Sequence, residues 1–396
     1  MLKIHIAIPI LDELDYIENT IACINKQSYT EFQIYICVNQ PDFWWEGERI
    51  EKCLNNQKTI EWLRSNHPTI IIIDKSSKGN GWKDKDHGVG WARKILMDKI
   101  AESTTESDII VSLDADTEIS DNYLESIITA FNDNPNALAL SNPYYHKLTK
   151  NVNSNIAVLR YEIYMRCYAI NMMLIKSPYA FTALGSAISF PIKSYKMIKG
   201  IAPKKSGEDF YFLQRLRKTG NLLVWNSSTV FPASRFSNRV FFGTGPAMIK
   251  GNNGDWSSYP IYHFSLFENI NKTYKCFHQL FTEDINTPLD DFFKETFGEE
   301  NIWKPLRTNF KTLKNFINAC HNKFDGLRVL QYVKTNQAKT GLTDEICLYE
   351  NLKYFFNKEI IDKSFKFDES NVLELNKIRD ILFEKEQELQ KSCKII

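Results

Sequence analysis

Short apolar runs rich in β-branched residues alternate with amphipathic helical periods in the first third of the chain. The apolar runs lie at 3–10, 32–39, 69–74 and 108–113, and the helical periods lie at 15–28, 89–104 and 121–134. Apolar strands separated by helices are typical of a mainly parallel sheet with helices on both faces. The alternation therefore predicts a doubly wound α/β fold.

The residues at the ends of these strands are candidates for a ligand site. In open parallel sheets, ligands bind beyond the carboxyl ends of the strands, where the connecting loops gather. Pro9, Asn39, Asp74 and Asp114 stand at or just past such ends. We therefore expect a binding site along this edge of the sheet.

Size and charge limit the classes of partner. The chain has 396 residues, of which 43% are hydrophobic, enough for a large core with an appendage. Its formal net charge of +1 gives no global field that would attract nucleic acid or anionic lipid. No stretch approaches the roughly 20 apolar residues of a membrane helix, and the opening MLKIHIAIPIL is expected to be a strand and not a signal peptide. We expect no nucleic-acid partner and no transmembrane segment, and peripheral membrane contact stays open.

The cysteines indicate the redox environment. There are eight, scattered along the chain, and none forms a CxxC pair. This spacing favours reduced thiols over a disulfide framework or a zinc site, and it predicts a cytoplasmic protein.

The character of the sequence changes at about residue 266. Before this point lies a Gly-rich stretch at 241–258, FFGTGPAMIKGNNGDWSS, which we expect to form a mobile loop. After it glycine is scarce, and Phe, Lys and Glu recur at helical spacing. We therefore expect a helical C-terminal region over 266–396.

A pair of carboxylates follows the fourth apolar run, in DIIVSLDADTEIS. Asp114 and Asp116 here admit three interpretations. The first is a strand-end turn, where Asp is common. The second is a phosphatase of the haloacid dehalogenase type, which is set aside because three strands precede the motif and Glu118 stands where a Thr is expected. The third is an oxygen-ligand site for Mg²⁺ or Mn²⁺ bridging a diphosphate.

A second acidic pair, Glu208 and Asp209, opens a helical period in GEDFYFLQRLRKTG. Acidic residues at a helix start are ordinary capping residues. Together with IAIPILDELDYIENTIACINKQ, GVGWARK, IIVSLDADTEIS and LGSAISFPIKSYKMIKGI, however, this segment resembles the family 2 glycosyltransferases of the GT-A fold. The five segments follow the family's order and cover roughly residues 4 to 225.

The resemblance implies a fold and a reaction. The fold is a GT-A, Rossmann-like, mainly parallel sheet flanked by helices, with a GT-A glycosyltransferase domain at 1–265 and the helical appendage at 266–396. Within it, 1–120 would be the nucleotide-binding half and 121–265 the donor-sugar and acceptor half. The reaction is metal-dependent transfer of a single hexose-type sugar from a nucleotide-diphosphate sugar, preferably a UDP-sugar, to an acceptor hydroxyl with inversion. The cofactor would be Mn²⁺ or Mg²⁺.

Three other functions differ from single-sugar transfer in the residues that they need. The Q-x-x-R-W element of processive synthases is absent from the sequence, which favours single-sugar transfer. A non-catalytic sugar-nucleotide or glycan-binding module on the same fold is an alternative, although it would have no use for a catalytic base. A sugar nucleotidyltransferase would need a Gly-rich triphosphate loop after the first strand, and IPILDELDY has none. The acceptor could be a glycan, a lipid-linked molecule or a small molecule.

The resemblance assigns donor-binding roles. Pro9 and Asn39 match the positions that hold the base, with Asn39 where an Asp is common; its amide can both donate and accept. Arg93 matches a position that reaches toward the nucleotide, and a surface helix arginine is its alternative. Gly185 and Ser186 match the stretch that lines the donor sugar, where a small residue lets the backbone approach closely.

The resemblance also assigns the metal, and residue chemistry suggests a site for the diphosphate. Asp116 would coordinate the metal directly, and Asp114 would contact ribose or act through water. His263, after the Gly-rich stretch, is a candidate third ligand, although a lone His among aromatic residues is more often a core residue. Arg235 and Arg239 could clamp the diphosphate, since guanidinium groups match phosphate geometry, or be solvated loop residues.

The catalytic base is expected in the second acidic pair. An inverting displacement needs a base on the face opposite the leaving group, separate from the metal carboxylates. Asp209 matches the family's catalytic position. Glu208 would orient the acceptor or cap the helix.

Overall fold

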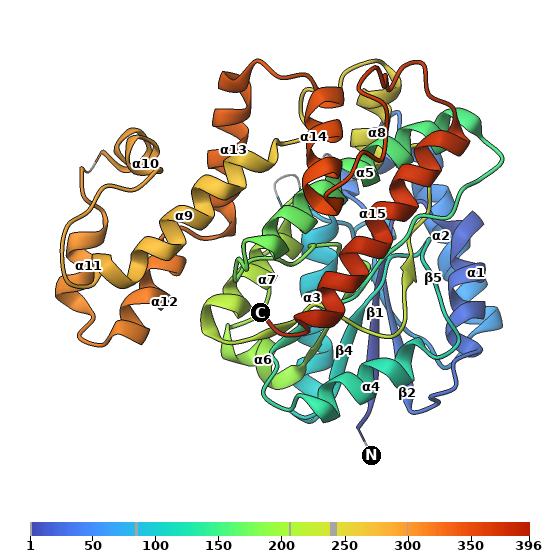
Figure 1. Cartoon of the computed structure of the whole chain (residues 1–396). Coiled ribbons are helices and arrows are strands. Elements are labelled where there is room, and N and C mark those ends of the chain that lie inside the picture. Colours follow the sequence, from blue (N-terminus) through green and yellow to red (C-terminus); the bar gives the residue numbers. More distant parts are fainter. Residues whose placement is uncertain (1, 84–85, 206, 238–243, 299) are drawn as a thin grey trace. The chain divides into compact units, whose positions relative to one another are not determined.

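The computed structural model describes residues 2–83, 86–205, 207–237, 244–298 and 300–396 (Figure 1). The chain forms two compact units. The first unit contains Met1–Val158, Phe181–Trp256 and Gln390–Ile396, and the second contains Leu159–Ala180 and Ser257–Leu389. The functional division expected at residue 265 stays a prediction.

The first unit is built on a seven-stranded sheet. Its strands are β1 (Ile4–Ile10), β2 (Phe32–Asn39), β3 (Ile71–Lys75), β4 (Ile109–Ser112), β6 (Ala139–Ser141), β7 (Ile188–Pro191) and β8 (Leu222–Leu223). The order across the sheet is β3-β2-β1-β4-β7-β6-β8. Only β7 runs antiparallel to its neighbours in this sheet, and the other pairs are parallel. The predicted mainly parallel α/β sheet is confirmed.

Alternation along β1 shows why the sheet is covered on both faces. Ile4, Ile6, Ile8 and Ile10 belong to one apolar cluster, whereas Ala7 belongs to the cluster on the other face. Successive strand side chains point to opposite faces, so both faces of an apolar strand must be buried. A central strand of this kind holds the polar residues at its carboxyl end in fixed positions.

Helices complete the two layers around this sheet (Figure 1). Residues of α1 (Leu14–Asn25), α2 (Ile50–Asn66) and α4 (Tyr123–Asp133) pack in the cluster of the β1 isoleucines. Residues of α3 (Val89–Ser103), α6 (Ile192–Met197) and α7 (Glu208–Thr219) pack in the cluster on the opposite face. The helices expected at 15–28, 89–104 and 121–134 are therefore present as α1, α3 and α4.

Two segments differ from the sequence expectation. Helix α2 was not expected from the sequence, because its buried side includes Asn56 and Thr59 and its apolar periodicity is therefore weak. The Gly-rich stretch was expected to be a mobile loop, which is wrong for α8 (Thr244–Asn252). The short 3₁₀ helix η1 (Asp42–Glu46) follows β2.

A small second sheet and a returning segment complete the first unit. Strand β5 (Glu118–Ile119) pairs antiparallel with β9 (Val230–Phe231). At the sheet edge, Leu222 and Ile396 exchange two backbone hydrogen bonds of 3.0 Å, and the Val224 N–H donates to the Lys394 carbonyl at 3.0 Å. Residues 394–396 therefore cover the outer edge of β8.

The second unit is helical. It contains α9 (Phe264–Leu280), α10 (Asp290–Phe297), α11 (Trp303–Asn309), α12 (Leu313–Lys323), α13 (Gly326–Thr340) and α14 (Asp344–Phe356). Residues of α5 (Val152–Leu174) and α15 (Val372–Ser392) also contribute to it. The side chains of Thr312, Asp325 and Thr343 cap α12, α13 and α14 by accepting backbone N–H bonds. The predicted helical C-terminal region is confirmed. Among the described residues, no helix is both long enough and apolar enough to span a bilayer.

A buried ion network links α5 to α15 within the second unit. Glu162 accepts hydrogen bonds from Arg166 Nε at 3.0 Å and from Arg379 Nη1 at 3.2 Å. Arg166 also pairs with Glu386. All four side chains are almost fully buried, so each charge depends on its partners in place of water.

Glu162→Gln is expected to destabilise the fold, because it removes the carboxylate that two buried guanidinium groups share. Losing one partner of a buried pair lowers the free energy of unfolding by about 3 to 5 kcal/mol. Urea denaturation of the full chain measures the change. Glu295→Gln is the control: its pair with Lys339 is exposed, so its effect should stay within about 1 kcal/mol. Equal stabilities of the two variants would contradict the role given to the network.

Candidate active site

A buried arginine lies at the centre of the candidate site. Arg93 extends from α3, and its side chain is 6% exposed. Its Nη2 bonds Asp114 Oδ1 at 2.5 Å, and its Nη1 bonds the buried carboxylate of Glu208. The alternative of a surface helix arginine is therefore wrong. Arg93 joins the end of β4 to the start of α7, and so brings together the two acidic pairs identified in the sequence.

Gly185 makes room for this arginine. A Cβ built on Gly185 would lie 2.1 Å from Arg93 Nη2 and 2.3 Å from its Cζ, closer than any real contact. A side chain at this position would therefore displace the guanidinium. The predicted role of Gly185 beside the donor sugar stays a prediction, and the structure provides a separate reason for the glycine. Ser186, the next residue, is buried ahead of β7.

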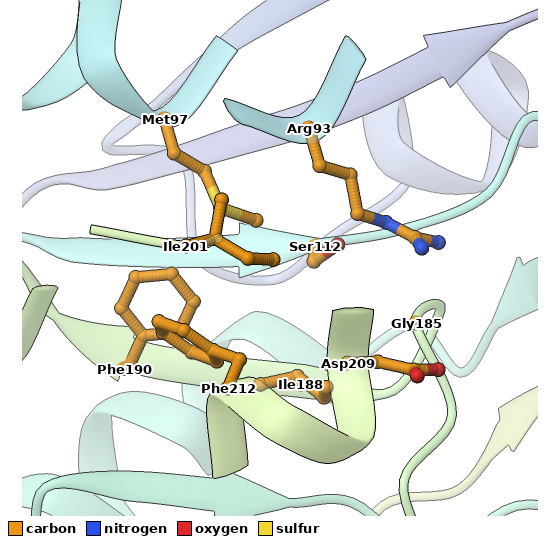
Figure 2. A pocket seen from close by; sticks show the side chains of 9 residues that line it. All are labelled: Arg93, Met97, Ser112, Gly185, Ile188, Phe190, Ile201, Asp209 and Phe212. Carbon is orange, nitrogen blue, oxygen red and sulfur yellow. The ribbon is translucent and has the colours of Figure 1, made fainter. Parts of the chain in front are cut away.

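Arg93 and Asp209 meet at a small pocket, shown in Figure 2. The pocket is lined by Arg93, Met97, Ser112, Gly185, Ile188, Phe190, Ile201, Asp209 and Phe212. The guanidinium and the Asp209 carboxylate point toward the same end of it, while the other end is apolar (Figure 2). The apolar end lowers the local polarity around the charged groups.

Asp209 has the properties of a proton acceptor. Burial, followed by the charge of neighbouring Glu208, raises the pKa of Asp209 to about 7, against the opposing effect of Arg93. A carboxyl group with a pKa near the working pH is suited to general base catalysis. Glu208, in contrast, has an oxygen bound by Arg93 and serves as an anchor for that guanidinium.

The start of α7 is fixed by backbone geometry as well as by this ion pair. Gly207 precedes the acidic pair with φ of 73°, a left-handed conformation that favours glycine. The backbone around Lys204 packs so closely on α3 that a Cβ on Gly90 would lie 2.2 Å from the Lys204 carbonyl oxygen. These constraints hold Asp209 in place relative to Arg93.

The other carboxylate of the strand-end motif is paired with a different arginine. Arg235 Nε and Nη2 lie 3.0 and 2.6 Å from Asp116 Oδ2. The same Nη2 bonds Glu13 Oε2 at 2.5 Å, and the guanidinium lies over the Tyr16 ring, 3.8 Å from its centroid. Burial raises the pKa of Asp116, and the charge of Arg235 opposes that shift.

Asp114 and Asp116 suit a divalent cation by the chemistry of their donor atoms. Carboxylate oxygens are the ligands that Mg²⁺ prefers, and this ion is commonly held by one or two carboxylates plus water and substrate phosphates. The guanidinium groups on both side chains show that this end of the sheet attracts positive charge. Within the described ranges, no group of three or more His, Cys, Asp and Glu residues could form a complete metal site from protein atoms alone.

His263 belongs to the second unit, where both of its ring nitrogens have partners. Nε2 lies 2.8 Å from Glu350 Oε2, and Nδ1 lies 2.7 Å from Ser265 Oγ. His263 also caps α9 by accepting the Ser265 N–H. These contacts give it a structural role, and its role as a metal ligand stays a prediction.

The positions predicted to bind the base, Pro9 and Asn39, lie at the ends of β1 and β2. Asn39 is 3% exposed; its Nδ2 donates to the Ile10 carbonyl at 2.8 Å, and its Oδ1 accepts from Trp82 Nε1 at 3.1 Å. Pro9 is buried in β1 beside Cys37 of β2. Since both ends of the Asn39 amide are engaged within the protein, its contact with a base stays a prediction. Arg239 lies outside the described residues.

Three residues near the site were not singled out in the sequence. Trp82 follows Gly79 and Gly81, and glycines beside an aromatic residue after a strand were the available signal. Glu13 and Tyr16 lie three residues apart at the start of α1, which places them on one helix face. No sequence signal linked these two residues to Arg235, because that contact spans 222 positions.

The comparisons with known proteins agree with this geometry. Residues 109–258 match the family model described as "Glycosyl transferase family group 2". This part of the chain is therefore similar to glycosyl transferase family group 2. The predictions of a family 2 resemblance and of a glycosyltransferase enzyme are thereby confirmed. In this glycosyltransferase, the matched range includes both acidic pairs and Arg235.

Solved structures similar to the glycosyltransferase chain are distant. Staphylococcus aureus TarS 1-349 in complex with UDP-GlcNAc is 12% identical with a TM-score of 0.40, over 99% of this chain and 91% of that one. The mannosyltransferase PcManGT from Pyrobaculum calidifontis, in complex with GDP-Man and Mn²⁺, is 12% identical with a TM-score of 0.38, over 90% and 88%. A sequence search of curated proteins finds no match.

Gly185→Ala tests the packing around Arg93. The added methyl group cannot fit beside the guanidinium, so Arg93 should move from Asp114 and Glu208. A displacement of about 1 Å near the reacting groups can lower turnover by ~100-fold. Gly47→Ala is the control, because a Cβ there meets only one atom at 3.9 Å and its φ is −129°. Steady-state turnover with a donor that supports activity measures the effect, and equal rates for the two variants would contradict the packing argument.

Proposed function

We propose that this glycosyltransferase moves a single sugar from a UDP-sugar to an acceptor hydroxyl, with a divalent cation at Asp116 and inversion at the anomeric carbon. The observation that carries the proposal is Arg93, whose two terminal nitrogens bind Asp114 on one side and Glu208 on the other. This pairing puts a strand-end carboxylate and a separate acidic pair in one site. An inverting transfer needs that separation, because leaving group and base act on opposite faces of the sugar.

The chain's residues divide between the two halves of the reaction. Asp116 and Asp114 would hold Mn²⁺ or Mg²⁺, which when bound neutralises charge on the departing diphosphate. Arg93 holds Asp114 and positions Glu208, and Glu208 in turn fixes the start of α7.

The chemical step is a single displacement. The Asp209 carboxylate takes the proton of the acceptor hydroxyl as that oxygen forms a bond to the anomeric carbon. The bond from the anomeric carbon to the diphosphate oxygen breaks with its electron pair, and the nucleotide diphosphate departs. The small pocket beside Asp209 has an apolar end, which favours a carboxyl group that is neutral after the transfer.

The donor base and the cellular location rest on other observations. The uridine preference rests on the family resemblance and on Asn39, whose orientation is set by Ile10 and Trp82. The cytoplasmic location, and with it a role in cytoplasmic glycan biosynthesis, rests on the eight cysteines, which are all free thiols in the structure. A panel of UDP- and GDP-sugars, scored by thermal stabilisation with Mn²⁺, identifies the donor.

Asp116→Asn tests the metal. The amide has lost the negative charge that attracts a divalent cation, so the Mn²⁺-dependent part of UDP binding should disappear while the fold is kept. Calorimetric titration of UDP with and without Mn²⁺ measures this. Asp133→Asn, an exposed change at the end of α4, is the control. Unchanged Mn²⁺-dependent affinity in Asp116→Asn would refute the metal assignment.

Asp209→Asn tests the base. The amide cannot accept the proton, so turnover should fall by roughly two to four orders of magnitude while UDP affinity is retained. Because the raised pKa of Asp209 is about 7, the carboxyl is protonated below that pH. Turnover of the unmodified enzyme should therefore rise with pH through about 7 and level off above it.

The pH profile and the variant must agree. The residual turnover of Asp209→Asn should lack the rise through pH 7. Near-normal turnover in this variant, measured at saturating acceptor, would mean that another group takes the proton.

A further inference from the structure

We infer that Arg235 is a resident counter-ion of Asp116 that makes cation binding depend on the nucleotide diphosphate, and that Glu13 and Tyr16 are the seat that holds it. The inference rests on the proposed metal role of Asp116. The sequence predicted Arg235 only as a clamp for the diphosphate, and it predicted no role for Glu13 and Tyr16.

Arg235 has three partners of different kinds. Its guanidinium is shared between the carboxylates of Asp116 and Glu13, and one of its faces lies on the Tyr16 ring. A planar guanidinium can bind two carboxylates through separate N–H groups and stack on an aromatic ring at the same time. Arg235 can therefore release Asp116 and still keep two of its contacts.

The seat is fixed more firmly than an ordinary surface pair. Glu13 is 5% exposed and stands at the first turn of α1, where its carbonyl accepts the backbone N–H groups of Tyr16 and Ile17 at 3.0 Å. The residue before it, Asp12, has φ of 60°, an uncommon conformation for a residue other than glycine. The Asp12 N–H donates to Asn56 Oδ1 at 2.9 Å, which secures this turn.

The seat is also fixed relative to Asp116. Thr20, one turn further along α1, donates its hydroxyl to the carbonyl of Ala115 at 2.8 Å in a buried hydrogen bond. The helix that carries Glu13 and Tyr16 is thus bonded to the residue next to Asp116. The guanidinium between them cannot relax far from Asp116 as long as Glu13 holds it.

Competition for Asp116 gives this arrangement its consequence. Asp114, the second carboxylate proposed to hold the cation, is paired with Arg93, and Asp116 is paired with Arg235. A divalent cation alone must therefore displace a guanidinium from Asp116 Oδ2, and that guanidinium would stay beside the cation. A cation that arrives with a diphosphate brings its own compensating charge. The geometry therefore favours the metal–nucleotide pair over the free metal.

The test measures Mn²⁺ binding and needs no turnover. The protein is titrated with Mn²⁺ alone, with UDP alone, and with Mn²⁺ in the presence of UDP. The first and third titrations give the Mn²⁺ affinity without and with the nucleotide, and their ratio is the coupling between metal and nucleotide. In Arg235→Gln, Mn²⁺ alone should bind roughly tenfold tighter or more, and its coupling to UDP should weaken by a similar factor, within the usual range of coupling between sites. Unchanged Mn²⁺ affinity in this variant would overturn the inference.

Lys147, whose side chain contacts residues of the small sheet, provides a matched control. Lys147 pairs with Glu118 of β5 at 2.5 Å and lies over the Phe231 ring of β9 at 4.4 Å. It is also a cation shared between a carboxylate and an aromatic ring, but it does not contact Asp116 in any described interaction. Lys147→Gln should leave both Mn²⁺ affinities as they are. An equal gain of affinity in both variants would mean that net charge alone acts, which would overturn the specific role of Arg235.

Glu13→Gln is expected to change the Mn²⁺ affinity in the direction opposite to Arg235→Gln. Of the two carboxylates that contact Arg235 in the described part of the chain, Glu13→Gln leaves only Asp116 charged, so Mn²⁺ alone should bind more weakly than in the unmodified protein. Arg235→Lys keeps the positive charge but loses the planar guanidinium that binds two carboxylates at once. It should therefore raise the Mn²⁺ affinity by less than Arg235→Gln does. Tighter Mn²⁺ binding in Glu13→Gln would contradict the role of Glu13 in holding Arg235.

The inference and the proposed function fail in different ways. If Asp116→Asn leaves Mn²⁺ binding intact, the metal site itself is wrong. If Asp116→Asn abolishes Mn²⁺ binding while Arg235→Gln behaves as the unmodified protein, the metal site stands and only the counter-ion role is wrong. Thermal denaturation of each variant shows that the comparison is made between folded proteins.

Discussion

The ion pair of Arg93 with Asp114 and Glu208 is the interaction on which the site depends. It connects three elements: α3, the end of β4 and the start of α7. A buried guanidinium is costly unless its partners are well placed. The structure meets this requirement with two carboxylates and with a glycine, Gly185, that leaves space for the charge.

A second strand-end carboxylate, two residues further along the chain, is also paired with an arginine. Asp116 has its own arginine, Arg235, and that arginine has a second carboxylate in Glu13. The two guanidinium groups differ in what surrounds them. Arg93 is enclosed and its side chain is 6% exposed, whereas the Arg235 side chain is 20% exposed and one of its faces rests on an aromatic ring. The first is suited to holding a fixed geometry, and the second to exchanging partners.

Much of the fold could be predicted from local pattern. The isoleucines of β1 and the helical periods of α1, α3 and α4 carry their structure in residues that are close in sequence. Helix α2 was missed because its buried face includes polar Asn56. The acidic pairs could also be located, the first because it follows an apolar strand and the second because it opens a helical period. The guanidinium groups that bind them could not be assigned, because those contacts join residues 21 to 119 positions apart and depend on the packed fold.

The pairing of residues 394–396 with β8 bears on how the chain acquires its structure during synthesis. A strand at the border of a sheet exposes unpaired backbone groups and invites pairing with other chains. When β8 leaves the ribosome, the segment that will protect it has not been made, and all the helices from α8 to α15 are translated first. This border, the outer edge of β8, therefore stays unpaired for most of the second half of the chain's synthesis. A chaperone that binds extended strands can act at this border throughout that interval.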